Sequence, residues 1–129
     1  MSAFVTEDRS SSPEPLVVVV DDDDSSREVV RFLLEEEGYR VASFASPAAA
    51  LASLTGAGDE IAVLLTDVHL PGMSGPELAS RILAHHPDVR IAFVTGDLAP
   101  PEGIAGEFIQ KPIDLDEITG FVARSLGRV

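Results

Sequence analysis

Five short segments with strand character alternate with segments of helical pattern from residue 16 onward, and this alternation limits the possible folds. The first, Leu16–Val20, is a continuous apolar run, which is typical of a parallel strand buried on both faces. Strand and helix in alternation predict an α/β protein, a doubly wound parallel sheet of five strands with helices on both faces. The predicted strands are Leu16–Val20, Arg40–Phe44, Ile61–Thr66, Arg90–Thr95 and Glu107–Gln110.

Capping residues mark where the intervening helices begin and end. Ser25, with Glu28 three residues later, has the spacing of a capping box, and Gly38 is placed to end that helix. Ser46, Ser74 and Asp114 are the expected N-caps of three later helices. The apolar residues at helical spacing, which we expect to face the core, are Val29, Val30, Leu33, Leu34, Leu78, Ile82, Leu83, Leu115, Ile118, Val122 and Leu126.

Length, charge and cysteine content exclude several classes of protein. The chain of 129 residues suits one domain, predicted over 16–129 after a flexible tail of residues 1–15 rich in Ser, Pro and acids. The absence of cysteine excludes a disulfide scaffold and a thiolate metal site. A net charge of −13 argues against direct binding to nucleic acid. Without a long apolar run or a signal peptide, we expect no membrane insertion and a cytoplasmic location.

Polar side chains follow four of the five predicted strands. Asp21 and Asp22 come after the first strand, Asp67 after the third and Lys111 after the fifth, while Thr95 ends the fourth. Lys111 is the only lysine in the chain. Ligands of parallel sheets bind beyond the carboxyl ends of the strands, so we expect these five side chains to converge at one edge.

Clustered carboxylates repel one another, and the repulsion has two physical remedies. Either one acid takes up a proton, or a divalent cation binds among the oxygens. Oxygen ligands completed by water suit Mg²⁺ or Mn²⁺. A cation on one side and the Lys111 ammonium on the other would attract a phosphoryl group to Asp67, which predicts a carboxylate nucleophile at that position.

The segments around these residues resemble the receiver domain of bacterial two-component response regulators, the family that includes the chemotaxis regulators. The resemblance covers residues 16 to about 126 and implies a flavodoxin-like sheet of strand order 2-1-3-4-5. The segments are VVVVDDDDSSREVVRFLLEEEGY, LLTDVHLPGMSGPEL, AFVTGD and FIQKP.

The resemblance also implies roles for individual residues. Asp67 would accept a phosphoryl group from a phosphohistidine on a sensor histidine kinase or a histidine phosphotransfer protein. Asp22, Asp67 and the backbone carbonyl of His69 would ligate Mg²⁺ directly, with Asp21 acting through water. Lys111 would pair with the phosphoryl oxygens.

Two further residues correspond to the family's conformational switch. The Thr95 hydroxyl would donate to the phosphoryl group and draw its loop inward, and Phe108 would turn in as Thr95 moves. The Lys111–Pro112 bond is expected to be cis. A receiver of this kind, stand-alone or part of a hybrid sensor kinase, would act through a downstream protein partner and would not be an enzyme beyond its own phosphotransfer and autodephosphorylation.

The segment between Thr95 and Lys111 departs from the family pattern. It reads GDLAPPEGIAGEFIQ, is shorter than usual, and contains Pro100-Pro101, which blocks a helix interior. We therefore expect a shortened or irregular fourth helix. Similar shortened segments occur in receivers attached to, or paired with, sensor kinases.

Two other functions are compatible with parts of the sequence. Asp21-x-Asp23 and Thr95 fit the opening motifs of a Mg²⁺-dependent haloacid-dehalogenase-type phosphatase, but the later acidic pair and a cap domain of that family have no counterpart here. A receiver-like binding module that is never phosphorylated is the other alternative, because the shortened segment alters the usual output surface. Asp23 and Asp24 match no ligand position and are expected to be solvated acids at a helix start.

Overall fold

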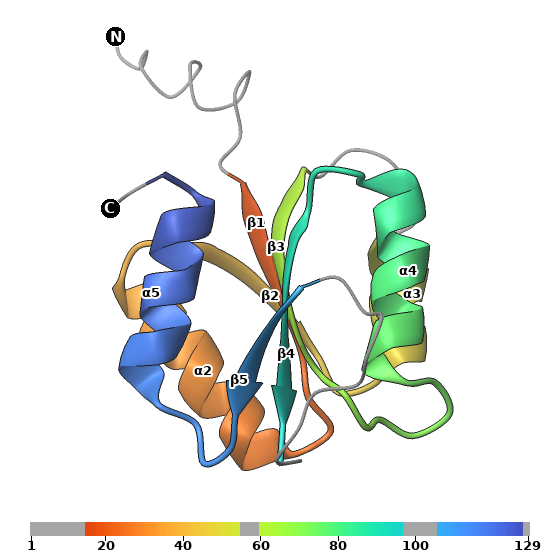
Figure 1. Ribbon diagram of the computed structural model, residues 1–129, viewed down its shortest axis with the longest axis horizontal. Coiled ribbons are helices and arrows are strands. Elements are labelled where there is room, and N and C mark those ends of the chain that lie inside the picture. Colours follow the sequence, from red (N-terminus) through yellow and green to blue (C-terminus); the bar gives the residue numbers. More distant parts are fainter. Residues whose placement is uncertain (1–14, 55–59, 97–105, 128–129) are drawn as a thin grey trace, which may run out of the picture.

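The computed structural model describes residues 15–54, 60–96 and 106–127 (Figure 1). In these residues five strands alternate with helices, and the five predicted strands are confirmed, the third extending one residue further to Asp67. The predicted tail of residues 1–15 falls almost wholly outside the described residues, as does the expected irregular helix within 97–105. The elements are β1 (Leu16–Val20), α2 (Asp24–Glu36), β2 (Arg40–Phe44), α3 (Pro47–Leu54), β3 (Ile61–Asp67), α4 (Gly75–His85), β4 (Arg90–Thr95), β5 (Glu107–Gln110) and α5 (Leu115–Ser125).

The sheet is parallel throughout and has the order β2-β1-β3-β4-β5, which confirms the predicted fold class. Helices α2 and α5 cover one face and α3 and α4 cover the other (Figure 1). The register places Val20 beside both Phe44 and Thr66, and Thr95 beside Gln110. The strands are parallel and their carboxyl ends lie within two residues of one another in register, so the residues that follow them meet at one edge.

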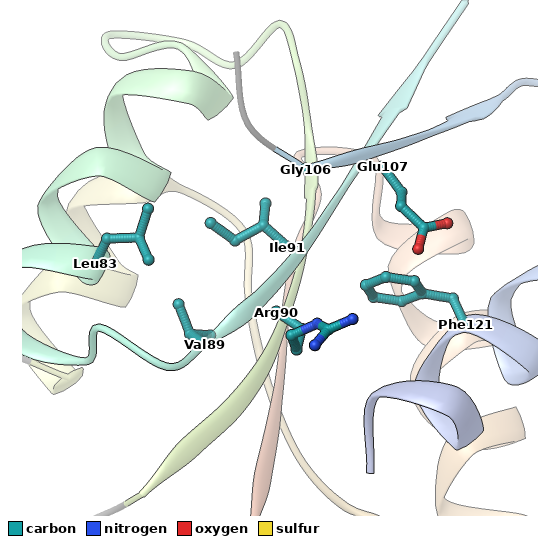
Figure 2. Close-up of a pocket in the computed structure, with 7 residues that line it drawn as sticks. All are labelled: Leu83, Val89, Arg90, Ile91, Gly106, Glu107 and Phe121. Atoms are coloured by element: carbon teal, nitrogen blue, oxygen red, sulfur yellow. The ribbon is translucent and has the colours of Figure 1, made fainter. Parts of the chain in front are cut away.

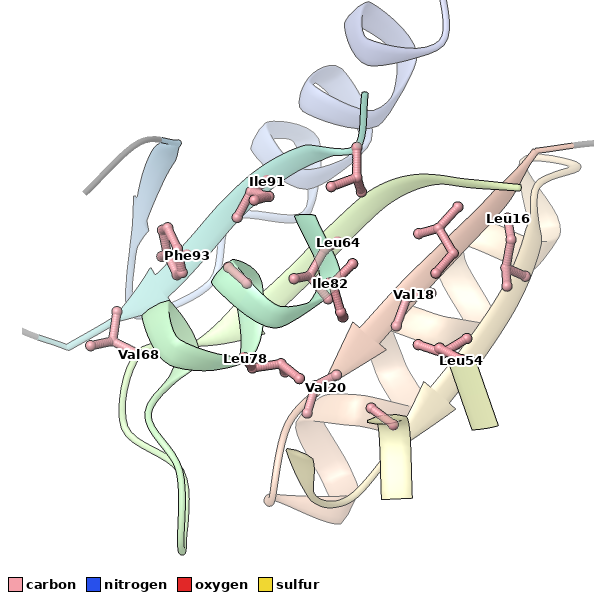
Figure 3. Close-up of a cluster of buried hydrophobic side chains, with 14 residues drawn as sticks. Leu16, Val18, Val20, Leu54, Leu64, Val68, Leu78, Ile82, Ile91 and Phe93 are labelled. Carbon is pink, nitrogen blue, oxygen red and sulfur yellow. The ribbon is translucent and has the colours of Figure 1, made fainter. Parts of the chain in front are cut away.

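Strand β1 lies between two hydrophobic layers, one on each face of the sheet. Val18 and Val20 point toward α3 and α4, while Val17 and Val19 point toward α2 and α5. Figure 3 shows the first layer, in which Leu78 and Ile82 of α4 pack over the sheet. A strand with both faces covered must be apolar at every position, which explains the unbroken run of valines.

The N-cap of α2 differs from the prediction. The helix is capped by Asp23, whose side chain accepts a hydrogen bond from the Ser26 backbone N–H at 2.8 Å, and not by Ser25. Asp23 has extended backbone angles and an acceptor as good as serine's, so the helix begins two residues before the predicted start. The predicted caps Ser46, Ser74 and Asp114 are confirmed by hydrogen bonds to backbone N–H groups.

Two of the residues predicted to face the core are exposed instead. Val29 is 50% exposed and Leu115 is 38% exposed, whereas the neighbouring Val30 and Ile118 are buried. Val29 lies about 100° around the helix from Val30, which turns it away from the sheet. Leu115 is the first residue of α5, where the helix has not yet reached the core. In the part of the chain that the structure describes, no helix combines the length and apolar character that crossing a bilayer requires.

Candidate functional site

Three carboxylates meet at the carboxyl edge of the sheet. Asp21, Asp22 and Asp67 each offer an oxygen, and these atoms all lie within 4.8 Å of one another. Since β1 and β3 are neighbours in register, the residues after Val20 and Thr66 are placed side by side. Asp21 and Asp67 are each only 5% exposed, while Asp22 is open to solvent.

The single lysine completes this cluster from the edge strand of the sheet. The Lys111 Nζ lies 3.4 Å from Oδ1 of Asp67, and the lysine side chain is 39% exposed. Its backbone N–H donates to the Thr95 carbonyl at 2.7 Å, which extends the pairing of β4 and β5 by one residue. The Lys111–Pro112 bond is cis, as the resemblance implied.

The electrostatics of the cluster are dominated by excess negative charge. Burial raises the pKa of Asp67 to about 7, helped by a hydrogen bond with Asp21 and by the charge of Asp21. Lys111 acts in the opposite direction but only partly offsets this rise. At neutral pH the site therefore favours either a proton on Asp67 or an additional cation among the three carboxylates.

The loop that presents Asp21 and Asp22 is held by several hydrogen bonds. Asp21 Oδ1 accepts from the Asp23 backbone N–H at 2.9 Å, and the Asp21 N–H donates to the Phe44 carbonyl at 3.1 Å. Arg27 on α2 reaches back, and its Nη1 donates to the Asp21 carbonyl at 2.8 Å. No expectation for Arg27 followed from the sequence, and this contact was not predicted. Its spacing of six residues from Asp21 was the available signal.

Gly75 explains why a glycine stands eight residues after Asp67. A Cβ at this position would lie 2.0 Å from the Asp67 carbonyl oxygen, and the Gly75 N–H donates to the Val68 carbonyl at 2.8 Å. The first residue of α4 therefore packs directly against the end of β3. Only glycine allows this approach, which positions the backbone that bears Asp67.

The remaining predicted site residues surround the cluster at different depths. Thr95 is 4% exposed at the end of β4, beside the strand that ends in Asp67. The Phe108 ring stacks on Phe93 with 5.3 Å between ring centroids, on the α4 side of the sheet. His69 is exposed two residues beyond Asp67. Asp23 and Asp24 are exposed at the start of α2 and, as expected, lie outside the carboxylate cluster.

A hollow of about 360 Å³ lies at the other end of the sheet (Figure 2). It opens where β4 and β5 begin, between α4 and α5. None of the predicted site residues lines it, so its size does not make it the functional site. Its lining consists of Leu83, Val89, Arg90, Ile91, Gly106, Glu107 and Phe121.

Comparison with known proteins agrees with this geometry. The family model described as the response regulator receiver domain matches residues 17–123. The chain therefore belongs to the response regulator receiver family, whose members are signalling domains of two-component systems. The resemblance stated from the sequence is thus confirmed.

Individual relatives support the same assignment. The response regulator receiver protein CpdR of Brucella abortus is 34% identical over 105 residues, which cover 74% of this chain and 86% of CpdR. The transcriptional regulatory protein DctD of Rhizobium meliloti is 35% identical over 120 residues, 88% of this chain but 26% of DctD. The chain thus spans about a quarter of DctD, and it spans 50% of the regulator FixJ of Azorhizobium caulinodans.

Solved structures show the same architecture. A response regulator receiver domain from Clostridium thermocellum superposes with a TM-score of 0.78 at 25% identity, covering 88% of this chain and 95% of that one. The receiver domain of the hybrid histidine kinase CckA gives a TM-score of 0.74 at 29% identity, covering 86% and 98%.

Proposed function

We propose that this chain is a phosphoacceptor, in which Asp67 receives a phosphoryl group from the phosphohistidine of a partner. The observation that supports this most directly is a buried carboxylate beside two others, with an ammonium 3.4 Å away. In the reaction an Asp67 carboxylate oxygen bonds to phosphorus, the phosphorus–nitrogen bond breaks, and the histidine ring leaves. Later attack by water releases inorganic phosphate and restores the aspartate.

The donor set fits a hard divalent cation. Asp21, Asp22 and Asp67, with the backbone carbonyl of His69, would hold Mg²⁺ or Mn²⁺, with Asp21 acting through water. The pKa of Asp67 is raised mainly by burial and further by Asp21, so a cation bound among these carboxylates would favour the ionised form of Asp67. When bound, the cation neutralises charge on the carboxylates and on the incoming phosphoryl oxygens.

Three further residues would respond once Asp67 is phosphorylated: Lys111, Thr95 and Phe108. Lys111 already faces Asp67 and would pair with a phosphoryl oxygen. The Thr95 hydroxyl would donate a hydrogen bond to the phosphoryl group. Movement of Thr95 toward that group would change the packing of Phe108, whose ring stacks on Phe93 of β4. A change in this packing would pass the signal to a downstream protein partner.

An apolar groove beside the site suits the phosphodonor protein. Val29 and Leu115 line a groove of about 280 Å³ between α2 and the start of α5, together with Ser25, Ser26, Val30 and Ile113. Phe32, which is 62% exposed, lies one helical turn beyond Val29. Ser25 directly follows Asp24 and Ile113 lies two residues after Lys111, so a histidine-bearing helix of a cytoplasmic sensor kinase or phosphotransfer protein could bind in this groove.

Phosphorylation by acetyl phosphate tests the proposed function without a partner. We expect the intact mass to rise by one phosphoryl group in a Mg²⁺-dependent manner, and Asp67→Asn to abolish the gain. Phe32→Asp should leave this reaction unchanged while slowing transfer from a phosphorylated sensor kinase. If wild type gains no mass while a known receiver is labelled, the chain is the non-phosphorylated binding module instead.

A further inference from the structure

Arg27 contacts both the loop that follows β1, Asp21–Asp23 (the acid loop), and Asp24 at the start of α2. Its Nη1 donates to the Asp21 carbonyl at 2.8 Å, and its Nη2 pairs with Asp24 Oδ1 at 2.6 Å. The Arg27 side chain is only 13% exposed, compared with 35% for Arg31 and 56% for Arg81 and Arg124 in their ion pairs. Arg27 is therefore partly buried against the loop, whereas the other three are more open to solvent.

The contact with the Asp21 carbonyl has a geometric consequence for Asp22. This carbonyl belongs to the peptide that joins the two residues, so a hydrogen bond to it restrains the plane of that peptide. The plane in turn sets the direction in which the Asp22 side chain leaves the backbone. Asp22 is the exposed member of the carboxylate cluster, and it gains no such restraint from burial.

We propose that Arg27 is a positioning residue for the divalent cation, because it holds the loop in the conformation that brings the Asp22 carboxylate to Asp21 and Asp67. The inference rests on the proposed function, since it concerns the cation of the same site. The arginine fork makes both contacts at once, which a lysine ammonium does less well because it lacks the rigid planar geometry.

The sign of the effect separates this role from a plain electrostatic one. Arg27 carries a positive charge near a site for a positive ion, so charge alone would weaken cation binding. Removing that charge would then tighten binding of Mg²⁺. If Arg27 positions the loop, removing it weakens binding despite the more favourable charge.

Arg31 offers a matched control on the same helix. It forms ion pairs with Glu28 and Glu35, and both partners lie on α2 itself. Arg31→Gln therefore removes the same side chain and the same charge one turn further along the helix, without touching the acid loop.

The test is the Mg²⁺ dissociation constant of the full chain, measured by isothermal titration calorimetry for wild type, Arg27→Gln, Arg27→Lys and Arg31→Gln. Thermal unfolding without Mg²⁺ is recorded for each variant to separate binding from folding. We expect Arg27→Gln to raise the constant roughly tenfold, the usual range for a residue that orients metal ligands. Arg27→Lys keeps the charge and should give an intermediate rise of about threefold. Arg31→Gln should stay within about twofold of wild type, since its charge is distant and solvated.

The outcomes distinguish this inference from the proposed function. An Arg27→Gln constant equal to or lower than that of wild type would overturn the positioning role, as would an equal loss in Arg31→Gln. If Arg27→Gln does not fold, Arg27→Lys decides alone, because its unchanged charge makes any rise a matter of geometry. A wild type that binds no Mg²⁺ would overturn the proposed function itself, and this inference with it.

Discussion

The two ends of the sheet hold charged residues in different ways. At the carboxyl end Asp21 and Asp67 are 5% exposed, and the pKa of Asp67 is raised to about 7. At the amino end Glu107 and Arg124 form an ion pair at 3.6 Å, with both side chains more than half exposed. Water screens the second pair, whereas burial leaves the first group dependent on its neighbours. Burial therefore shifts the pKa of a carboxylate at one end, while the exposed ion pair at the other end is screened by water.

The hollow at the amino end strengthens this contrast. It has the larger concave volume but is lined mostly by apolar side chains, with Arg90 and Glu107 exposed at its rim. The carboxyl end is shallow and yet brings three carboxylates and an ammonium together. The proposed chemistry of this molecule is therefore inferred from the placement of charge and not from the size of a cavity.

The largest expected effect comes from the backbone contact that supports the carboxyl end. Gly75→Ala would place a Cβ 2.0 Å from the Asp67 carbonyl, so α4 or β3 must shift, at a cost of about 3 kcal/mol or more in unfolding free energy. Urea unfolding measures this loss. Gly120→Ala in α5 is the control, because its Cβ meets only the mobile end of Arg124 at 3.3 Å. It should be neutral or stabilising by up to about 1 kcal/mol. Equal stability of the two variants would contradict the close packing inferred at Gly75.

A smaller effect, dependent on pH, is expected from the buried charge itself. The raised pKa means that the folded chain disfavours ionised Asp67, so this residue costs wild type stability as the pH rises from the ordinary carboxyl range through about 7. Asp67→Asn removes that cost. Without divalent cations, the variant should gain on the order of 1 to 2 kcal/mol over wild type between pH 5 and pH 8.5.

Chemical unfolding at the two pH values measures this gain. Saturating Mg²⁺ should reduce it, since the cation stabilises the ionised wild type. A stability difference between variant and wild type that does not change with pH would mean that Asp67 is not destabilised by its charge.

The smallest effect is expected at the amino end. Glu107→Gln removes the ion pair with Arg124, in which both side chains are more than half exposed, and should change the unfolding free energy by no more than about 0.5 kcal/mol at any pH. Thermal unfolding of wild type and Glu107→Gln in low and high salt measures this change in unfolding free energy. A loss as large as that from a buried charge would remove the contrast between the two ends.

Local pattern predicted most of the fold because each signal depends on a few neighbouring residues. The apolar run of β1, the caps at Ser46, Ser74 and Asp114, and the order of acids and lysine along the chain all needed no knowledge of distant contacts. The start of α2 was misplaced because Asp23 and Ser25 are both good caps, and only the path of the chain after β1 selects between them. The prediction that Val29 faces the core was also wrong, because periodicity alone does not show how wide a face of the helix the sheet covers.

The sequence by itself determined the strand–helix alternation, the family, and which residues follow each strand. Tertiary structure decided which of these residues approach one another and at what depth. Strand register brings Asp67 to Asp21 and Lys111, and burial shifts its pKa. These properties depend on distances between segments far apart in the chain or on exclusion of water. Neither is encoded in local periodicity, so each appears only when the whole sheet is assembled.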